Sequence, residues 1–171
     1  MNSLILVRHG QSIWNREKRF TGWADVELTE KGKSEANRAG ELLKELNIEY
    51  NSCFSSNLKR AINTLEIILK ILDKTSIEII KTEALNERHY GGLTSLNKDE
   101  IIKKYGYKQV QIWRRSFNVA PPPMDKSHPY KSKINSTISQ ESLKETYERV
   151  IPFYNKKIEP LLLSKKNILV V

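Results

Sequence analysis

Residues 4–10 read LILVRHG: the four consecutive apolar residues Leu4–Val7 are followed at once by Arg8, His9 and Gly10. An apolar run of this length is typical of a strand buried on both faces of a parallel sheet. Arg8, His9 and Gly10 then fall at the carboxyl end of that strand, where open α/β sheets bind their ligands. A neutral imidazole there can attack phosphorus while a neighbouring guanidinium holds the phosphoryl oxygens. Three residues also recur by chance, so a hydrogen-bonded structural histidine is an equally good interpretation of this stretch alone.

The first half of the chain alternates short apolar strands with amphipathic helices. Helical periodicity predicts a helix over residues 29–46, with Thr29 as its N-cap. Residues 53–55 follow as a short strand, Ser56 is placed to cap a second helix, and residues 77–80 form a third strand. Strand–helix–strand–helix–strand order with short connections is typical of a doubly wound α/β fold. We therefore expect a mostly parallel sheet flanked by helices.

The second half of the chain is richer in helices and loops. The pattern predicts a helix after Asn97, a helix over 108–117, a helix over 140–158 that Pro152 kinks or restarts, and a buried strand over 167–171. Residues 124–138 are rich in Ser, Lys and Pro and are expected to be mobile. Because the sequence shows no internal repeat and no second domain, residues 1–171 are expected to form a single domain.

Composition limits the compartment and the partners of the chain. None of its apolar runs approaches the ~20 residues that a membrane span requires, and no charged-then-apolar leader precedes the first strand. Cys53 is the single cysteine and cannot form an internal disulfide, so it is expected to be a small core residue in a reducing compartment. We therefore expect a cytoplasmic protein with no membrane partner.

The net charge of +9 comes mainly from lysine, and the lysines are scattered along the predicted helices rather than clustered. This distribution argues against a nucleic-acid partner. The arginines are fewer, and the planar guanidinium binds phosphate and carboxylate in a bidentate way. The positive field is therefore expected to steer a small anionic substrate inward.

Seven further blocks follow the Arg8-His9-Gly10 turn in a fixed order. They are Gln11–Asn15, Arg19–Trp23, Leu28–Gly32, Ser56–Ala61, Leu85–Leu93, Leu96–Lys98 and Trp113–Arg115. Their order and spacing closely resemble the cofactor-dependent phosphoglycerate mutases of the histidine phosphatase superfamily. The resemblance covers nearly the whole chain and loosens only around residues 124–139.

The resemblance implies a glycolytic and gluconeogenic isomerase that interconverts 3-phosphoglycerate and 2-phosphoglycerate. In such an enzyme a histidine, here His9, becomes phosphohistidine, and 2,3-bisphosphoglycerate primes it without any metal. Arg8 and Arg60 would hold the phosphoryl group, and Glu87 would transfer the proton of the substrate hydroxyl. Considered alone, Arg60 is more readily a solvated surface charge, and Glu87 a partner of Arg88 in a surface ion pair. The sequence carries no cluster of Cys, His, Asp and Glu at metal-ligand spacing.

A further set of positions matches family residues that bind phosphate, the substrate carboxylate or the distal phosphate. They are Gly10, Gln11, Ser12, Ile13, Trp14, Asn15, Thr21, Gly22, Arg88, His89, Tyr90, Lys98, Arg114 and Arg115. Two consecutive arginines on one helix point in different directions, which leaves open that one of them stacks on Trp113. His128 matches nothing in the family and is expected to be a loop residue.

One part of the family pattern is missing from this sequence. The family carries a second catalytic histidine in a turn directly after the strand that corresponds to residues 168–171, and the sequence ends at Val171. Because the two family histidines face each other from adjacent strand ends, residues 168–171 are expected to pair beside residues 4–7. We therefore expect a C-terminally incomplete fold and an impaired mutase. Two alternatives stay open: a phosphatase of the same superfamily, and a non-catalytic remnant or anion-binding protein. The sequence does not fix the oligomeric state, and a homodimer is compatible with it.

Overall fold

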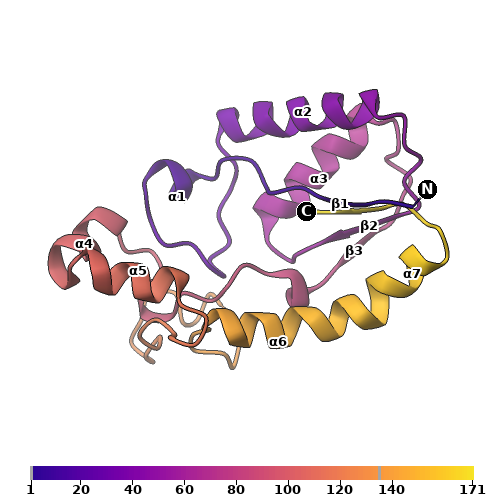
Figure 1. Cartoon of the computed structure of the whole chain (residues 1–171). Helices are drawn as coiled ribbons and strands as arrows, with labels where there is room; N and C mark the ends of the chain where they lie inside the picture. The colour runs from indigo at the N-terminus through magenta and orange to yellow at the C-terminus, as the bar shows by residue number, and fades with distance from the viewer. Residues whose placement is uncertain (1, 135) are drawn as a thin grey trace. The chain divides into compact units, whose positions relative to one another are not determined.

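The computed structural model describes residues 2–134 and 136–171 (Figure 1). These residues group into two compact units that alternate along the chain. Unit 1 comprises the chain up to Ile13 together with Val26–Leu85 and Val150–Val171, and unit 2 comprises Trp14–Asp25 and Asn86–Arg149. Each unit contains hydrophobic clusters of its own. The expectation of a single domain stays a prediction.

A four-stranded parallel sheet forms the centre of unit 1. Its strands are β1 (Leu4–Leu6), β2 (Ser52–Ser55), β3 (Ile79–Lys81) and β4 (Ile168–Val170), in the order β1-β4-β2-β3. The last strand pairs with the first, with Leu4 opposite Ile168, and the N–H of Val7 donates to the carbonyl of Val170 over 2.9 Å. Both the parallel sheet and the pairing of the first and last strands are confirmed.

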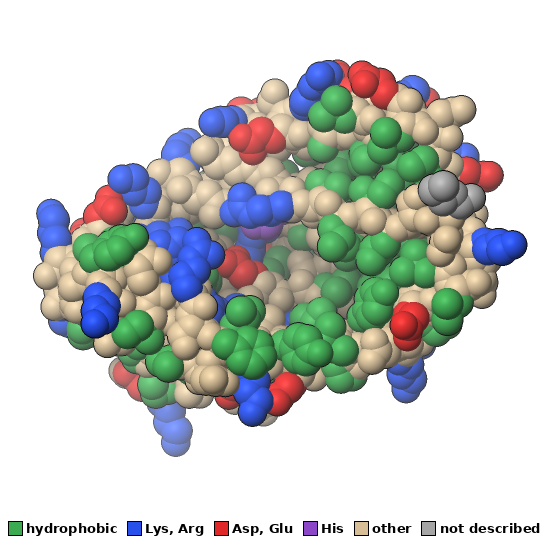
Figure 2. All heavy atoms as spheres, viewed as in Figure 1, with side chains coloured by type: hydrophobic (Ala, Val, Ile, Leu, Met, Phe, Trp, Pro, Cys, Tyr) green, Lys and Arg blue, Asp and Glu red, His purple; other side chains and the backbone are tan. Residues whose placement is uncertain are grey.

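The expectation that the first strand is buried on both faces is wrong, and β4 has that property instead. All three residues of β4 are buried, whereas Leu6 of β1 is 72% exposed. The physical reason is position, because β1 lies at an edge of the sheet and has a strand neighbour on one side only among the described residues. Figure 2 shows hydrophobic side chains gathered around this edge of unit 1.

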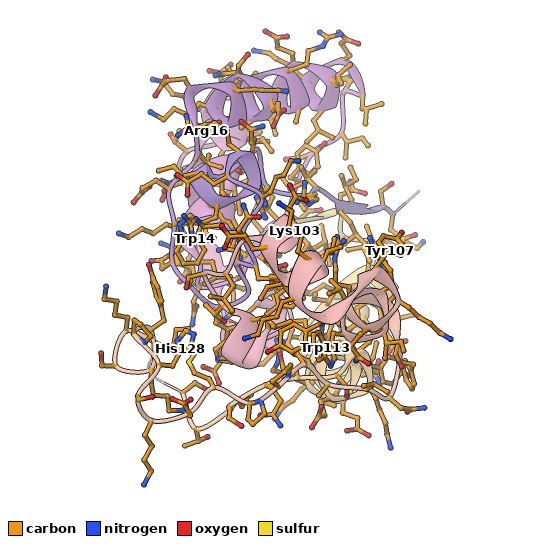
Figure 3. The ribbon with its side chains drawn as sticks, turned by 90° about the vertical axis from the view of Figure 1, so that its left-hand side faces the viewer. Trp14, Arg16, Lys103, Tyr107, Trp113 and His128 are labelled. Carbon is orange, nitrogen blue, oxygen red and sulfur yellow. The ribbon has the colours of Figure 1, made fainter. Side chains whose placement is uncertain are left out.

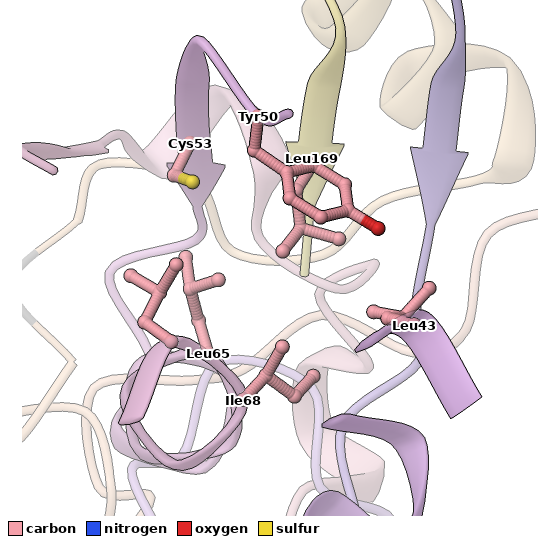
Figure 4. Packing of buried hydrophobic residues seen from close by; sticks show 7 residues of the cluster. Leu43, Tyr50, Cys53, Leu65, Ile68 and Leu169 are labelled. Carbon is pink, nitrogen blue, oxygen red and sulfur yellow. The ribbon is translucent and has the colours of Figure 1, made fainter. Parts of the chain in front are cut away.

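Helices cover both faces of the sheet, as a doubly wound fold requires. On one face, α2 (Glu30–Glu45) and α3 (Lys59–Ile71) supply Leu43, Leu65 and Ile68, which pack toward Cys53 and Leu169 of the strands (Figure 4). Neighbouring residues of a strand point to opposite faces. Accordingly, a second cluster on the other face joins Phe54, Ile158, Ile168 and Val170. Burial also raises the pKa of the Cys53 thiol to about 11, which fits its predicted role as a core residue.

The two predicted helix starts in unit 1 have different outcomes. Thr29 is the N-cap of α2 as expected, since its side chain accepts from the N–H of Gly32. Ser56 is not the N-cap of α3, because Leu58 occupies that position and has no side-chain oxygen to offer. The Ser56 hydroxyl instead accepts from the N–H of Leu58 at 3.4 Å, in the turn before the helix.

Pro152 interrupts the last long helix, as predicted. The helix α6 (Leu143–Phe153) passes into a single π turn, η3 (Tyr154–Ile158), and then into α7 (Glu159–Leu163). Proline lacks the N–H that continues an α-helical ladder, and π turns commonly absorb such a break. The helix begins three residues later than expected because Ser142 and Glu145 form a reciprocal cap, with the Ser142 N–H 2.6 Å from Glu145 Oε2.

Unit 2 is built from short helices and turns. They are α1 (Ile13–Arg16), which enters unit 2 at Trp14, η2 (Gly91–Leu93), α4 (Lys98–Tyr105), α5 (Tyr107–Arg115) and the first part of α6. The short helix η1 (Glu83–Leu85) belongs to unit 1. Asn97 caps α4 as predicted, accepting from the N–H groups of Asp99 and Glu100. A core of Phe20, Leu93, Ile101 and Val110 holds this part together.

Part of the 124–138 stretch packs on the core of unit 2, although most of its described residues are exposed or half-buried, and its expected mobility stays a prediction. Met124 and Ile134 are buried against Trp23, and Tyr130 packs on the same cluster. Residue 135 lies outside the described part of the chain. His128, a loop residue as expected, lies 6.2 Å from the ring of Tyr130 (Figure 3). Among residues 2–134 and 136–171, none of the helices combines the length and the apolar character that a membrane span needs.

Candidate functional site

His9 lies in the turn directly after β1, and its two ring nitrogens have different partners. Nδ1 is 2.7 Å from the carbonyl of Gly10, and Nε2 accepts a hydrogen bond from Nε of Arg60 at 3.2 Å. A carbonyl only accepts, so Nδ1 carries the ring proton and Nε2 carries the free lone pair. The lone pair that a nucleophile needs is therefore on the nitrogen that faces the arginine.

The surroundings of His9 keep its ring neutral. Its pKa is lowered to about 4, mainly by burial and to a lesser extent by the positive charges of Arg60 and Arg8. The hydrogen bond to the Gly10 carbonyl acts in the opposite direction and does not outweigh them. At neutral pH the imidazole can attack without first losing a proton.

Two residues near the start of α3, Arg60 and Thr64, contact the loop that carries His9 and Gly10. Arg60 is the second residue of α3 and is only 1% exposed, while Arg8 is exposed. One helical turn further on, the Thr64 hydroxyl donates to the Arg60 carbonyl at 2.7 Å and accepts from the Gly10 N–H at 3.1 Å. Thr64 was missed at the sequence level, although its spacing of four from Arg60 places it on the same helix face. The burial of Arg60 excludes the alternative of a solvated surface charge.

Glycine is required where the His9 turn meets the start of α2. A Cβ on Gly10 would lie 2.1 Å from the Gly32 carbonyl oxygen, and one on Gly32 would lie equally close to the carbonyl of Gln11. The backbone carbonyl of Gln11 accepts a hydrogen bond from the N–H of Thr29, and the backbone N–H of Gln11 donates to the Glu35 carboxylate. The backbone of Gln11 thus fastens the turn to α2, in addition to any role toward a substrate.

The next predicted binding residues continue this fastening. Ser12 is buried and forms an isolated antiparallel bridge with Leu28, and the N–H of Ile13 donates to the carbonyl of Glu27. This strand-like pairing ends at Ile13, where unit 1 passes into unit 2.

Glu87 lies on a loop of unit 2 that follows η1. The residue is exposed, between the buried residues Asn86 and Arg88. Its backbone carbonyl accepts a hydrogen bond from Nε1 of Trp23 at 2.6 Å. The backbone of this exposed residue is therefore anchored by Trp23, which belongs to the core of unit 2.

Arg88 is buried and is fixed through one of its two terminal nitrogens. Nη2 donates to the carbonyl of Arg114 at 2.7 Å, and the guanidinium lies 4.9 Å from the centre of the Tyr90 ring. Nη1 is buried and has no hydrogen-bond partner among the described residues. Tyr90 packs on Phe20, over which the Lys98 ammonium lies at 5.8 Å. The guanidinium of Arg88 thus contacts Arg114 and Tyr90, and within the described part of the chain it forms no ion pair with the adjacent Glu87.

A second buried polar atom without a partner in the described residues is Oγ1 of Thr21. The following Gly22 has φ +54°, and a Cβ there would lie 3.0 Å from the Arg88 carbonyl. Buried donors and acceptors of this kind are rare in folded proteins unless water or a ligand satisfies them.

The remaining predicted residues of unit 2 lie on or near helices. Arg114 is half-buried and Arg115 is exposed at the end of α5. Trp113 pairs edge-on with Tyr105 at 5.1 Å (Figure 3). In α1, Trp14 packs edge-on against Tyr130 at 5.1 Å, and the carbonyl of the next residue, Asn15, accepts from the backbone N–H of Lys18.

His89 is fully buried, and its ring is used within unit 2. Nδ1 accepts from the N–H of Gly91 at 2.9 Å, and the ring lies 5.5 Å from that of Trp23. Burial lowers the pKa of His89 to about 4. Its backbone N–H donates to the carboxylate of Glu141, a residue that the sequence analysis did not single out.

The structure brings the predicted residues together in two sets. Unit 1 joins Arg8, His9, Gly10 and Arg60 at the carboxyl end of β1, and unit 2 joins Glu87 with Trp23 and Arg88 with Tyr90 and Arg114. That the two sets line one crevice stays a prediction. No group of three or more His, Cys, Asp or Glu in the described ranges is arranged to hold a metal ion.

Known proteins resemble this chain along almost its entire length. The family model described as histidine phosphatase superfamily (branch 1) matches residues 4–171. Two curated proteins named 2,3-bisphosphoglycerate-dependent phosphoglycerate mutase, from Parabacteroides distasonis and Treponema denticola, are 48% and 49% identical to it. Their alignments cover 99% and 98% of this chain, and 72% and 71% of those longer proteins. The crystal structure of phosphoglycerate mutase from Bacillus anthracis shares the fold, with a TM-score of 0.73 and 24% identity over 99% of this chain and 73% of that one.

Proposed function

The chain belongs to branch 1 of the histidine phosphatase superfamily and, within it, to the 2,3-bisphosphoglycerate-dependent phosphoglycerate mutases, and on this premise we propose that it interconverts 3-phosphoglycerate and 2-phosphoglycerate. The reaction passes through phosphohistidine at His9, and 2,3-bisphosphoglycerate supplies the first phosphoryl group. A glycolytic role of this kind agrees with the expected cytoplasmic location. The names of the curated relatives support the substrate and the primer.

The observation that carries the proposal is the contact between His9 and Arg60. A neutral imidazole whose Nε2 lone pair faces a buried guanidinium is arranged for attack on a phosphate ester. Arg60 can transfer its hydrogen bond from Nε2 to the phosphoryl oxygens as the phosphorus approaches. Arg8, on the same turn, adds a second positive charge. The charge of the transferring group is thus balanced without a metal ion.

We assign the proton transfer to Glu87. When the C2 hydroxyl of 3-phosphoglycerate attacks phosphorylated His9, the bond from phosphorus to Nε2 breaks, a bond from phosphorus to oxygen forms, and Glu87 accepts the hydroxyl proton. The product is 2,3-bisphosphoglycerate. After it has turned in the site, His9 attacks its C3 phosphoryl group and Glu87 returns the proton to the departing C3 oxygen. The products are then 2-phosphoglycerate and phosphorylated His9, so the catalyst is regenerated.

Two buried atoms support a substrate site in unit 2. Nη1 of Arg88 and Oγ1 of Thr21 have no hydrogen-bond partner among the described residues, and a substrate carboxylate or phosphate can satisfy both. We assign the substrate contacts to the positions matched by the family: Gly10, Gln11, Ser12, Ile13, Trp14, Asn15, Thr21, Gly22, Arg88, His89, Tyr90, Lys98, Arg114 and Arg115. For Gln11 and His89 the contacts inside the protein support an additional role in shaping the site.

One experiment separates the proposed mutase from the other two functions. The protein is incubated with 2,3-bisphosphoglycerate and then with 3-phosphoglycerate, while phosphohistidine, 2-phosphoglycerate and inorganic phosphate are measured. A mutase forms phosphohistidine and then 2-phosphoglycerate. Phosphohistidine followed by inorganic phosphate alone identifies a phosphatase, and tight binding with no phosphohistidine identifies an anion-binding protein. The His128→Gln variant is the matched control and should behave as the unmodified chain, because His128 lies in a surface loop.

A further inference from the structure

We propose that Glu141 and Arg149 are positioning residues that hold the Glu87 loop in place for proton transfer. The proposal rests on the proposed role of Glu87. Neither residue belongs to a matched block, and both lie more than fifty residues further along the chain than the loop.

The two side chains form a buried, two-pronged ion pair. Nε of Arg149 lies 2.7 Å from Oε1 of Glu141, and Nη2 lies 2.9 Å from Oε2. The side chains are only 13% and 3% exposed. Bidentate arginine–carboxylate pairs fix the relative orientation of two segments, because two parallel hydrogen bonds leave no free rotation.

The two residues also form hydrogen bonds with the backbone on both sides of Glu87. Oε2 of Glu141 accepts from the N–H of His89 at 2.9 Å, and the N–H of Glu141 donates to the His89 carbonyl at 2.9 Å. On the other side of Glu87, Nη2 of Arg149 donates to the carbonyl of Asn86 at 3.2 Å. The loop is thus held at the residue before Glu87 and two residues after it.

Trp23 completes the support at Glu87 itself. Its Nε1–H donates to the Glu87 carbonyl at 2.6 Å, and the guanidinium of Arg149 lies 5.3 Å from the centre of its ring. The ring of His89 also lies 5.5 Å from the Trp23 ring. One tryptophan therefore links the ion pair to the backbone of the proposed acid–base residue.

A buried ion pair is weak evidence for stability, because removing two charges from water offsets most of their attraction. Four of its hydrogen bonds and ring contacts nevertheless converge on residues 86–89 and on Trp23. A displacement of about 1 Å at a reacting group can slow a reaction by about 10²-fold. Holding the Glu87 backbone gives this pair a function that a hydrophobic pair of the same volume lacks.

The test compares two phosphoryl donors to His9. Phosphorylation by 2,3-bisphosphoglycerate releases an alkoxide that needs a proton from Glu87, whereas phosphoramidate, whose nitrogen is already protonated, releases neutral ammonia and needs no acid. The Glu141→Gln and Arg149→Lys variants should slow phosphorylation of His9 by 2,3-bisphosphoglycerate by about 10–10²-fold and leave the rate with phosphoramidate unchanged. Glu148→Gln, next to Arg149 on α6 and exposed, is the matched control and should change neither rate.

A double-variant cycle distinguishes positioning from general stability. Once Glu87→Gln has removed the acid, adding Glu141→Gln should slow the bisphosphoglycerate reaction no further, because the two changes act through one group. Equal losses with both donors, or a full additional loss in the double variant, overturn the proposal and indicate a structural role only.

Two controls keep the outcome decisive. If Glu87→Gln itself slows both donors equally, the proposed function of Glu87 fails; if Glu87→Gln is selective and the Glu141 and Arg149 variants are not, only the positioning proposal fails. Should the ion-pair variants not fold, Trp23→Phe keeps an aromatic ring at this position but removes the donor to the Glu87 carbonyl. It should show the same selectivity for the bisphosphoglycerate donor, and an unselective loss or no loss contradicts the proposal.

Discussion

The Nε–H group of Arg60 donates a hydrogen bond to Nε2 of His9 across 3.2 Å, on the side of the ring opposite its bond to the Gly10 carbonyl. This contact assigns the tautomer of the imidazole and places a buried positive charge at the nucleophilic nitrogen. It forms between residues 51 positions apart, because β1 and α3 meet at the carboxyl edge of the sheet.

Replacing Arg60 should impair phosphorylation of His9 more than it impairs folding. Arg60→Gln removes a preorganised donor to the transferring phosphoryl group, so the rate of phosphohistidine formation from 2,3-bisphosphoglycerate should fall by about 10²–10³-fold. The pKa of His9 should rise, since a neighbouring positive charge is lost. Quenched-flow phosphorylation and NMR titration of the His9 ring measure the two effects.

The neighbouring Lys59 provides the control for this prediction. Lys59 begins α3 and pairs with Glu27 at 3.3 Å on the surface. Lys59→Gln should change the phosphorylation rate by less than about threefold, because surface ion pairs contribute little. Equal effects of the two substitutions would mean that Arg60 acts only through the general positive field.

The Glu87→Gln variant should lose turnover and retain substrate affinity. General acid–base catalysis contributes about 10²–10⁴-fold, so kcat should fall by that factor while KM changes little. Steady-state mutase kinetics with 3-phosphoglycerate give both constants. A large rise in KM with kcat preserved would instead make Glu87 a binding residue.

His89 should make the protein less stable in mild acid. The folded protein keeps this ring neutral down to about pH 4, whereas the unfolded chain protonates it below about pH 6.5. The unfolded state therefore binds the extra proton in that window, and the free energy of unfolding falls as the pH drops from about 6.5 toward 4. At pH 5 the loss from this residue should reach about 2 kcal/mol.

Urea unfolding at pH 7.5 and pH 5.0 checks this prediction against the His89→Phe variant. The variant loses the acceptor for the Gly91 N–H and should be less stable at pH 7.5. The difference in unfolding free energy between the two proteins should shrink at pH 5.0, because only the unmodified chain has an imidazole at position 89 that is protonated in the unfolded state and neutral in the folded state. A constant deficit at both pH values would contradict the low pKa of His89.

Gly10→Ala should destabilise the fold and displace the nucleophile together. The new methyl group would meet the backbone carbonyl of Gly32 at 2.1 Å, and backbone on both sides must shift, at a cost of about 1–3 kcal/mol. Gly40→Ala is the comparison, since its methyl group would lie 2.9 Å from Cβ of Ile71 and should also lower stability, whereas its position eight residues further along α2 than Gly32 should leave His9 phosphorylation unchanged. Thermal melts should therefore show a loss of stability in both variants, and His9 phosphorylation should fall in Gly10→Ala alone.

Local patterns in the sequence predicted the parts of the fold that local interactions determine. The cap at Thr29, the cap at Asn97 and the break at Pro152 each depend on residues within one or two turns. The exposure of Leu6 was not predictable from its apolar neighbours, because it depends on which strand lies at the edge of the sheet.

The candidate site was predictable where residues match a motif and not where distant segments meet. The matched blocks pointed to His9, Arg60 and Glu87; the structure shows the contact between His9 and Arg60, and the role of Glu87 stays a prediction. The pair of Glu141 and Arg149 was missed because charged residues are usually exposed, and its burial depends on contacts with a loop more than fifty residues away. The packing of Met124 and Ile134 on Trp23 was missed for the same reason, since Ser, Lys and Pro around them indicate a loop.

The measurement that bears most directly on His9 as the phosphoryl carrier is the identity of the phosphorylated nitrogen. The ¹⁵N-labelled protein is treated with 2,3-bisphosphoglycerate, and coupling between ¹⁵N and ³¹P is recorded by NMR at alkaline pH, where phosphohistidine is stable. Because Nδ1 donates to the Gly10 carbonyl and Nε2 faces Arg60, the coupling should appear at Nε2 of His9. A phosphoryl group on Nδ1 of His9, or on His89 or His128, would contradict the account.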